Sequence, residues 1–285
     1  MVLLVRFGEI ALKSRFVRRQ LRDRLVTNIQ DLFAAEREEC VTESDEARIY
    51  VHAADEGKAR GILARGFGIV SISPAREAHA DLATLSDLAA SEAGTLLGPG
   101  MSFAIRPRQV GTPFTSQDLG RDAGAAVRAA HPGVRVDLDR PDVEIHIEAR
   151  RNRGFVFHEF TPGPGGLPLG SQGRALAFVE SEPGMVAAWL GMKRGCRITV
   201  ASPSEDGHVE PLRRWDVRLG VVEATGLDAL RETDEFSRAD AIFLGTRWGE
   251  FSPARRTGIP VPVFEPLIGF SDREISSLAT RIRAA

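Results

Sequence analysis

A short loop, residues 180–184, carries the side chains with the clearest potential for chemistry. It follows the apolar run ALAFV (175–179) and precedes a stretch with helical periodicity from Met185. A strand, a tight turn and a helix form the usual setting of a phosphate-binding loop, where glycines and free backbone N–H groups hold the anion. The loop instead reads Glu180, Ser181, Glu182, Pro183 and Gly184. The setting is therefore present, but the residues differ.

The composition of this loop argues against bound phosphate. Pro183 has no N–H group to donate, and Glu180 and Glu182 place negative charge where an anion would lie. Carboxylates are themselves favoured at a helix N-terminus, so these glutamates would satisfy the helix end instead. We therefore interpret 180–184 as a degenerate nucleotide loop without a catalytic residue. We expect no cofactor, and ATP with Mg²⁺ only if the divergent loop is functional, with Glu180 or Glu182 then holding the metal.

Basic residues form the second feature with potential for chemistry. Residues 1–30 contain seven basic and two acidic side chains, a local charge of +5 in a chain whose net charge is −2. Arginine binds phosphate through its bidentate fork. A solvated helix face is the alternative. The candidate RNA-binding residues are Lys13, Arg15, Arg18, Arg19, Arg106, Arg108, Arg150, Arg151 and Arg153.

Length and composition restrict the class of protein. The 285 residues suffice for two or three domains, and 43% hydrophobic content is ordinary for a globular protein. The two cysteines and six histidines show no zinc or disulfide spacing, so no metal site is expected. No apolar run approaches the ~20 residues that span a bilayer, and no signal peptide is recognisable. We expect a cytoplasmic protein without a membrane partner.

Hydrophobic periodicity predicts the elements that hold these residues. Two helices are expected after N-caps, from Ser14 and from Thr115 or Ser116. Strand, helix, strand, helix, strand within about 75 residues suggests a small ferredoxin-like α+β unit. The Gly/Pro-rich segment 161–170 marks the best domain boundary. Beyond it, strands alternate with helices, one of them expected at 215–225, which predicts a parallel sheet.

Several motifs resemble one family, the THUMP-containing tRNA sulfurtransferases that make 4-thiouridine. GEIALKS (8–14) is similar to the family's N-terminal turn, and GPGGLPLGSQ (163–172) to the end of its THUMP domain. EPLIGFSDREI (265–275) resembles a late family element. Between them, FAIRPRQVGTPFTSQDLGRDAG (103–124) and RPDVEIHIEARRN (140–152) follow the THUMP pattern. The likeness runs through the whole chain in order and is stronger up to residue 172.

The resemblance implies a multidomain fold with α/β and α+β parts. Its domains would be ferredoxin-like (1–60), THUMP (61–164) and a Rossmann-like PP-loop type related to adenine nucleotide alpha hydrolases (165–285). In the family, the third domain adenylates a uridine carbonyl with ATP through an S-G-G-x-D-S loop, and cysteine persulfide delivers sulfur. This chain departs from the motif at 180–184 and lacks the family's glutamines in GTRWGEFSPAR (245–255). Cys196 matches a common family cysteine but is expected to be a buried strand-end residue.

The sequence therefore favours a tRNA-binding accessory factor over an active enzyme. In this hypothesis the first two domains bind the acceptor stem and 3′ CCA end of tRNA. The chain would lack adenylation activity, present tRNA to a separate tRNA-modifying enzyme, and form a homodimer as the family does. Two alternatives remain open, namely an active tRNA sulfurtransferase with a divergent ATP loop and a protein-binding assembly subunit.

Overall fold

The computed structural model describes residues 2–8, 14–204 and 207–285, without the side chain of Arg255. These residues divide into two compact units. The first comprises Met1–Leu4, Tyr50–Glu56 and Ser73–Thr161, and the second comprises Val5–Ile49, Gly57–Ile72 and Pro162–Ala285. Among the described residues, strands pair in the order β2-β3-β1-β4-β8-β7-β5-β6 in one sheet, with β9 on β4, and β12-β11-β10-β13-β14 in another.

The N-terminal segment alternates strands and helices as expected. Its elements are β1 (Val2–Phe7), α1 (Arg15–Ala35), β2 (Cys40–Ser44), β3 (Ile49–Ala53), α2 (Glu56–Leu63) and β4 (Ile69–His79). The helix α1 begins at the predicted cap, because the Ser14 hydroxyl accepts a hydrogen bond from the Val17 N–H at 3.4 Å. The strand β2 was not predicted, since its apolar Val41 is 64% exposed and none of its residues is buried.

The THUMP-like segment packs two helices against one sheet face. Its elements are α3 (Leu82–Leu96), β5 (Ser102–Val110), α4 (Ser116–Ala130), β6 (Arg135–Val136), β7 (Val143–Arg150), β8 (Arg153–Phe157) and β9 (Thr161–Pro162). The strands β5 and β7 are parallel, whereas β8 is antiparallel to β7. Thr115 is the N-cap of α4 and forms a capping box with Asp118, which confirms the predicted start.

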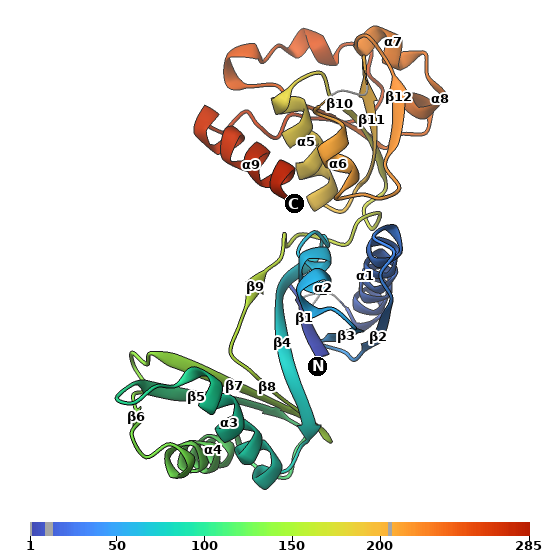
Figure 1. The fold of residues 1–285 in the computed structure, drawn as a ribbon. Helices are drawn as coiled ribbons and strands as arrows, with labels where there is room; N and C mark the ends of the chain where they lie inside the picture. The colour runs from blue at the N-terminus through green and yellow to red at the C-terminus, as the bar shows by residue number, and fades with distance from the viewer. Residues whose placement is uncertain (1, 9–13, 205–206) are drawn as a thin grey trace. The chain divides into compact units, whose positions relative to one another are not determined.

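The C-terminal segment forms the predicted parallel sheet. Its strands are β10 (Arg174–Phe178), β11 (Arg197–Ser202), β12 (Gly220–Glu223), β13 (Ala241–Leu244) and β14 (Val263–Phe264). Its helices are α5 (Glu182–Lys193), α6 (Glu210–Arg213), α7 (Leu227–Arg231), α8 (Asp234–Ser237) and α9 (Asp272–Ala284), with short 3₁₀ turns η2 (Trp248–Glu250) and η3 (Pro253–Arg256). Figure 1 shows α5, α6 and α9 on one side of this sheet.

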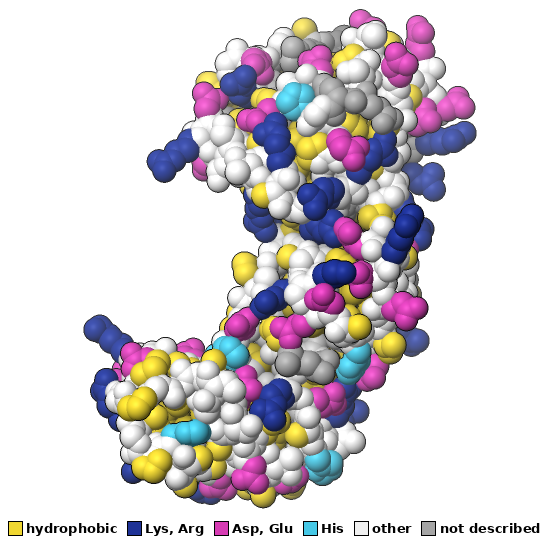
Figure 2. Space-filling model, in the orientation of Figure 1, with side chains coloured by type: hydrophobic (Ala, Val, Ile, Leu, Met, Phe, Trp, Pro, Cys, Tyr) yellow, Lys and Arg dark blue, Asp and Glu magenta, His cyan; other side chains and the backbone are white. Residues whose placement is uncertain are grey.

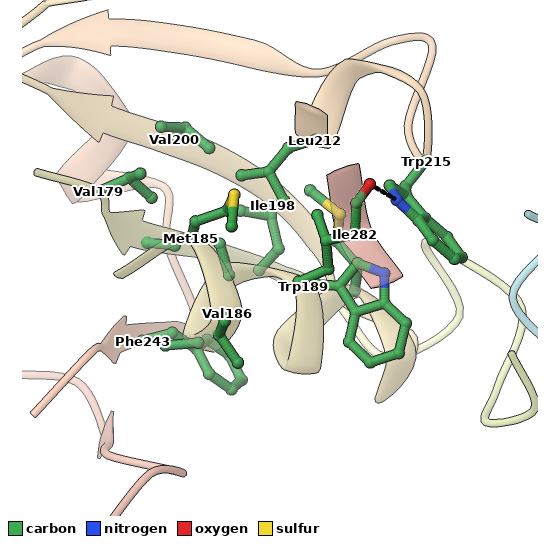
Figure 3. Packing of buried hydrophobic residues seen from close by; sticks show 14 of the residues in the cluster. Val179, Met185, Val186, Trp189, Ile198, Val200, Leu212, Trp215, Phe243 and Ile282 are labelled. Atoms are coloured by element: carbon green, nitrogen blue, oxygen red, sulfur yellow. Dashed lines mark hydrogen bonds between the residues drawn. The ribbon is translucent and has the colours of Figure 1, made fainter. Parts of the chain in front are cut away.

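Aromatic packing around α5 fixes this helix between the sheet and α9. The Trp189 and Trp215 rings meet edge to face at 5.2 Å, and the Trp215 Nε1–H donates to the Ile282 carbonyl at 3.0 Å (Figure 3). Phe67 adds a further edge contact to Trp189 at 5.5 Å. Since each fully buried large apolar side chain contributes roughly 1.5–3 kcal/mol, this cluster stabilises the packing of α5 in the C-terminal segment.

Two predicted elements differ from the structure. The helix expected at 215–225 is wrong, because α6 ends at Arg213 and Gly220–Glu223 form the edge strand β12. This segment is extended because it pairs in parallel with β11, where Val221 lies opposite Val200. The helix α5 also begins at Glu182, three residues before the expected Met185, because Pro183 is well suited to the first turn of a helix.

Candidate functional site

Arginines of the THUMP-like unit share one face of its sheet. Arg106 lies opposite His146 in the parallel β5–β7 ladder, and Val110 lies opposite Arg150. Side chains alternate along a strand, so Arg106, Arg108 and Arg150 lie on the face opposite to the helix-packed isoleucines. Those isoleucines (Ile105, Ile145 and Ile147) belong to the core formed with α3 and α4. The structure therefore brings these three predicted RNA-binding residues together.

Structural contacts already engage some of these arginines. Arg106 Nε donates to Glu144 Oε1 at 2.8 Å and its Nη2 to the Leu138 carbonyl at 2.9 Å. Arg153 Nε donates to Glu77 Oε1 at 2.5 Å, and its guanidinium lies 4.3 Å above the Tyr50 ring. By contrast, Arg108 is exposed and contacts no acidic group in the described part of the unit. Arg108 is therefore better placed than Arg153 to bind phosphate.

The hairpin between β7 and β8 presents Arg151 at its tip. Arg151 adopts a left-handed conformation with φ of 55°, and its N–H donates to the Val110 carbonyl at 2.9 Å. Farther along β7 on the same face, the Phe160 ring is 47% exposed and meets His146, which lies opposite Arg106, edge to face at 4.8 Å. Exposed aromatics beside arginines are the usual composition of surfaces that bind unpaired RNA bases.

The N-terminal arginines lie in the other unit, on or next to α1. Arg15 pairs with Glu46 at 3.1 Å and Arg19 with Asp23 at 3.7 Å, while Arg18 is half-buried. Exposed pairs of this kind contribute little to stability, so they yield readily to a phosphate competitor. Lys13, the remaining predicted residue, lies outside the described residues.

A cavity of about 470 Å³ lies where the strands β10 and β13 end. The strand order changes direction between these two neighbours. The chain adds β11 and β12 on one side of β10, and it then adds β13 and β14 on the other side. Such a switch in strand order is the common ligand site of open α/β sheets. The lining residues are Phe178, Glu180, Ser181, Pro183, Gly184, Gly226, Leu227, Leu244, Gly245, Thr246, Arg247 and Glu250.

The predicted loop lines this cavity, and Glu182 lies in the first turn of α5, where the helix dipole favours a carboxylate. Ser181, the N-cap of α5, makes no side-chain capping bond. The Glu182 carboxylate accepts a hydrogen bond from Arg283 Nη1 of α9 at 2.7 Å. The first-turn N–H groups of a helix have no intrahelical acceptor, and of the first-turn residues with an N–H group Gly184 lines the cavity.

Residues after β13 supply the other wall and were missed as site residues. Thr246 is 2% exposed, and its buried hydroxyl has no hydrogen-bond partner among the described residues. Arg247 is exposed and held by Asp272 at 3.1 Å. The sequence signal was available, because these residues directly follow AIFL (241–244), a strand buried along its whole length. Polar residues at the carboxyl end of a buried parallel strand are typical of a ligand site.

The cysteines lie away from this cavity lining. Cys196 is 8% exposed and precedes β11, at the end of the sheet opposite the cavity. Burial raises the pKa of its thiol, and Sγ donates weakly to the Gln172 carbonyl at 3.9 Å. Burial also raises the pKa of the half-buried Cys40 thiol.

Within the described ranges, no three His, Cys, Asp or Glu side chains gather as metal ligands, and no helix there is long and apolar enough to cross a bilayer.

Comparison with known proteins matches these domains. Residues 2–73 match the model of the ThiI ferredoxin-like domain, and residues 80–159 match the THUMP domain. The chain is 31% identical to the "Probable tRNA sulfurtransferase" of Methanothermobacter thermautotrophicus, over 99% of this chain and 84% of that protein. The chain belongs to the tRNA sulfurtransferase family. A second such protein, from Methanosarcina acetivorans, is 37% identical over 99% of this chain and 81% of its own.

Solved structures support the same fold. PH1313 from Pyrococcus horikoshii Ot3 superposes with a TM-score of 0.85 at 27% identity, over 99% of both chains. A 4-thiouridine synthetase solved as an RNA complex with bound ATP superposes with a TM-score of 0.76 at 21% identity, over 99% of this chain and 84% of that one. The multidomain architecture expected from the sequence is therefore confirmed.

Family membership corrects one prediction. The expectation that this chain lacks enzymatic activity is wrong, because its relatives across most of their length are named tRNA sulfurtransferases. The altered loop at 180–184 is no evidence of lost activity, since the loop borders a cavity that also contains the unsatisfied Thr246 hydroxyl.

Proposed function

We propose that this protein is a tRNA-thiolating enzyme whose THUMP sheet face binds tRNA and whose C-terminal cavity holds ATP. The observation that carries the proposal is the cavity at the β10–β13 switch in strand order, bordered by the first turn of α5 and the buried hydroxyl of Thr246. A buried hydroxyl without a partner costs about 1–3 kcal/mol, which a ligand oxygen would relieve. The cavity volume of about 470 Å³ is in the range of small-molecule sites such as those for nucleotides.

The residues around the cavity fit a nucleotide with a metal ion. The N–H group of Gly184 and the hydroxyl of Thr246 would donate to phosphate oxygens, and Arg247 would add positive charge. Glu180 and Glu250 are exposed carboxylates in the same lining and would offer oxygen ligands to Mg²⁺. Bound ATP supplies the activation that lets a uridine carbonyl oxygen leave in favour of sulfur.

The tRNA contacts are proposed in more detail from the THUMP surface. Arg108, Arg150 and Arg151 would bind backbone phosphates, and the exposed Phe160 ring would stack on an unpaired base. An acceptor stem with its single-stranded 3′ CCA end offers both groups. A cytoplasmic location is part of this proposal, because tRNA modification takes place on free tRNA, and the homodimer expected from the family resemblance is carried with it.

The first test is pyrophosphate release from ATP with and without tRNA. We expect release that depends on tRNA and accompanies uridine thiolation when sulfide is supplied. Replacing Thr246→Val should raise the ATP KM about tenfold, the usual cost of one hydrogen bond to a charged group. The control is Thr280→Val, because that hydroxyl bonds only to the Ser276 carbonyl of its own exposed helix. Absence of tRNA-dependent release from the wild-type protein would refute the proposed reaction.

The tRNA proposal is tested separately by affinity. We expect tight binding that weakens with salt and falls when the terminal CCA is removed, since phosphate contacts release counterions. Arg108→Gln should weaken binding about three- to tenfold. The same substitution at Arg128, an exposed arginine of α4 on the helix-covered side, serves as the control. Equal and weak binding of tRNA with and without CCA would exclude the acceptor end as the ligand.

A further inference from the structure

A second cavity in the C-terminal unit is lined almost entirely by arginines. It has a volume of about 460 Å³ and lies where β10 and β11 begin, since Arg174 and Arg197 are the first residues of those strands. The whole lining is Arg24, Gly170, Gly173, Arg174, Arg197 and Arg218. Four arginines and no acidic side chain face this space in a protein whose net charge is −2. Such a concentration of positive charge requires an explanation.

Two of the four arginines are neutralised and two are not. Arg197 Nη1 contacts Asp216 at 2.6 Å, and Arg218 Nη2 contacts Asp31 at 2.5 Å. The exposed side chains of Arg24 and Arg174 form no ion pair or hydrogen bond within the described ranges. The paired arginines are thereby held in place, while the unpaired ones provide charge for an external anion.

Both sides of this cavity belong to the same compact unit. Arg24 lies on α1, which contacts the segment before β10 because Asn28 Nδ2 donates to the Leu169 carbonyl at 3.1 Å. Asn28 is 9% exposed, so this bond lies inside the contact. The Asp31–Arg218 pair is a further link between α1 and the C-terminal domain. The four guanidinium groups are therefore positioned by the fold of one unit.

The backbone beside the arginines is shaped for close approach. Gly170 and Gly173 have φ angles of +78° and +87°, where a residue with a side chain is strained. A Cβ atom at Gly170 would lie 3.4 Å from Arg197 Nη2, so a larger residue would crowd that guanidinium. Between these glycines, the buried Ser171 hydroxyl has no hydrogen-bond partner in the described structure. The turn thus leaves both the guanidinium and the backbone accessible.

The basic surface continues beyond the first cavity. An adjoining cavity of about 220 Å³ shares Arg174 and Arg197 and adds Thr199 and Arg238, with Glu235 as its acidic member. Figure 2 shows Lys and Arg side chains gathered on the lower part of the C-terminal α/β domain in the drawn face. An extended series of arginines suits successive phosphates of a chain better than one small anion.

We propose that these arginines bind backbone phosphates of RNA at the beginning of the parallel strands. This second RNA contact lies at the opposite end of β10 from the proposed ATP cavity, about 13 Å away along the strand. Arg24 and Arg174 bind the phosphate oxygens, and Arg197 and Arg218 add positive charge beside them. The inference rests on the proposed function, because it assigns a further surface for the same tRNA.

The test measures tRNA affinity across a salt series for Arg24→Gln and Arg174→Gln. Each variant should weaken binding about three- to tenfold and lower the slope of log K against log salt by roughly 0.7–0.9. The matched control is Arg273→Gln, an exposed arginine of α9 that lines neither arginine cavity. Neither variant removes a structural ion pair, so melting temperatures should remain unchanged.

The outcomes distinguish this inference from the proposed function. If wild-type protein binds tRNA but both variants match Arg273→Gln in affinity and slope, the second contact is overturned and tRNA binding stands. If wild-type protein does not bind tRNA, both proposals fall. Inorganic pyrophosphate is the probe for a free anion. In the contrary outcome, pyrophosphate raises the melting temperature of the wild type but not of the two variants, while tRNA affinity stays the same in all three. That result would assign the site to a small anion and overturn the proposal that it binds RNA.

Discussion

The Cys196 thiol illustrates how burial decides a residue's role. It is 8% exposed, its pKa is raised by burial, and it lies at the opposite sheet end from the proposed ATP cavity. A thiol in this state supplies little thiolate for sulfur transfer. We expect Cys196→Ala to retain tRNA thiolation and to lower the free energy of unfolding by only about 1 kcal/mol. Thiolation assays and urea unfolding provide the check, and loss of activity in a folded variant would make Cys196 a sulfur carrier.

Individual arginines show what residue type alone does not reveal. Arg106, Arg108 and Arg153 looked equivalent in the sequence, as basic residues of alternating strands. In the structure Arg153 is engaged by Glu77 and Tyr50, and Arg106 by Glu144, whereas Arg108 is exposed without an acidic partner among the described residues. Glu144 is 38 residues from Arg106 in the chain, and Glu77 and Tyr50 are 76 and 103 residues from Arg153, so no local pattern predicts these partners.

At the scale of elements, close backbone approach joins the two walls of the proposed ATP cavity. A Cβ atom at Gly245 would lie 2.5 Å from the Pro183 carbonyl carbon and 2.7 Å from Gly184 Cα. Gly245→Ala therefore has to push the turn after β13 away from the first turn of α5. We expect it to lower the free energy of unfolding by about 1–3 kcal/mol and to raise the ATP KM.

Gly226 offers the matched control for that substitution. It lines the same cavity, its backbone is extended with φ of 173°, and a Cβ atom there would meet no atom within 4 Å. Gly226→Ala should leave stability nearly unchanged. Thermal melts and ATP titrations of both variants separate two effects. Gly245→Ala removes a glycine at a close backbone contact, whereas Gly226→Ala removes a glycine without such a contact. Equal behaviour of the two variants would contradict the contact between Gly245 and α5.

Periodicity predicted most elements, whereas the cavity depends on how they assemble. The caps Ser14 and Thr115 and the parallel C-terminal sheet followed from local signals. The strand β12 did not, because it is a short edge strand whose pairing with β11 comes from tertiary contact. Likewise, loop 180–184 was recognised as a ligand-loop setting, but its facing residue Thr246 is 62 or more residues distant and adjoins it only because β13 pairs with β10.

For the whole molecule, the two ends of one parallel sheet are assigned different tasks. The carboxyl ends of β10 and β13 border the cavity proposed for ATP, and the amino ends of β10 and β11 border the arginines proposed for RNA phosphate. The balance of charge differs between the two ends, since Glu180 and Glu250 line the first cavity beside Arg247, whereas four arginines and no acidic residue line the second. A metal ion would compensate the acidic residues there, so RNA held by arginines need not compete with the nucleotide for the same charges.

Both units also depend on ionised carboxylates, which predicts how acid affects the molecule. Hydrogen bonds from Thr115 lower the pKa of Asp118 in α4, and hydrogen bonds from Ser271 lower the pKa of Glu274 in α9. A carboxyl group whose pKa is lower in the folded state stabilises the fold above its unfolded pKa of about 4. That stabilisation is lost as the pH falls through the folded value. We therefore expect melting temperatures to decline progressively below about pH 5.

Substitution of the two caps separates this effect from general acid unfolding. Asp118→Asn and Glu274→Gln should each lower the melting temperature at pH 7 and flatten its decline toward pH 3, because neither replacement can lose a charge. The difference from wild type should shrink as the wild-type carboxylates become protonated. Calorimetry from pH 7 to pH 3 measures this convergence. Parallel curves, with the same offset at every pH, would show that the capping boxes act through geometry alone and that other carboxylates govern the acid response.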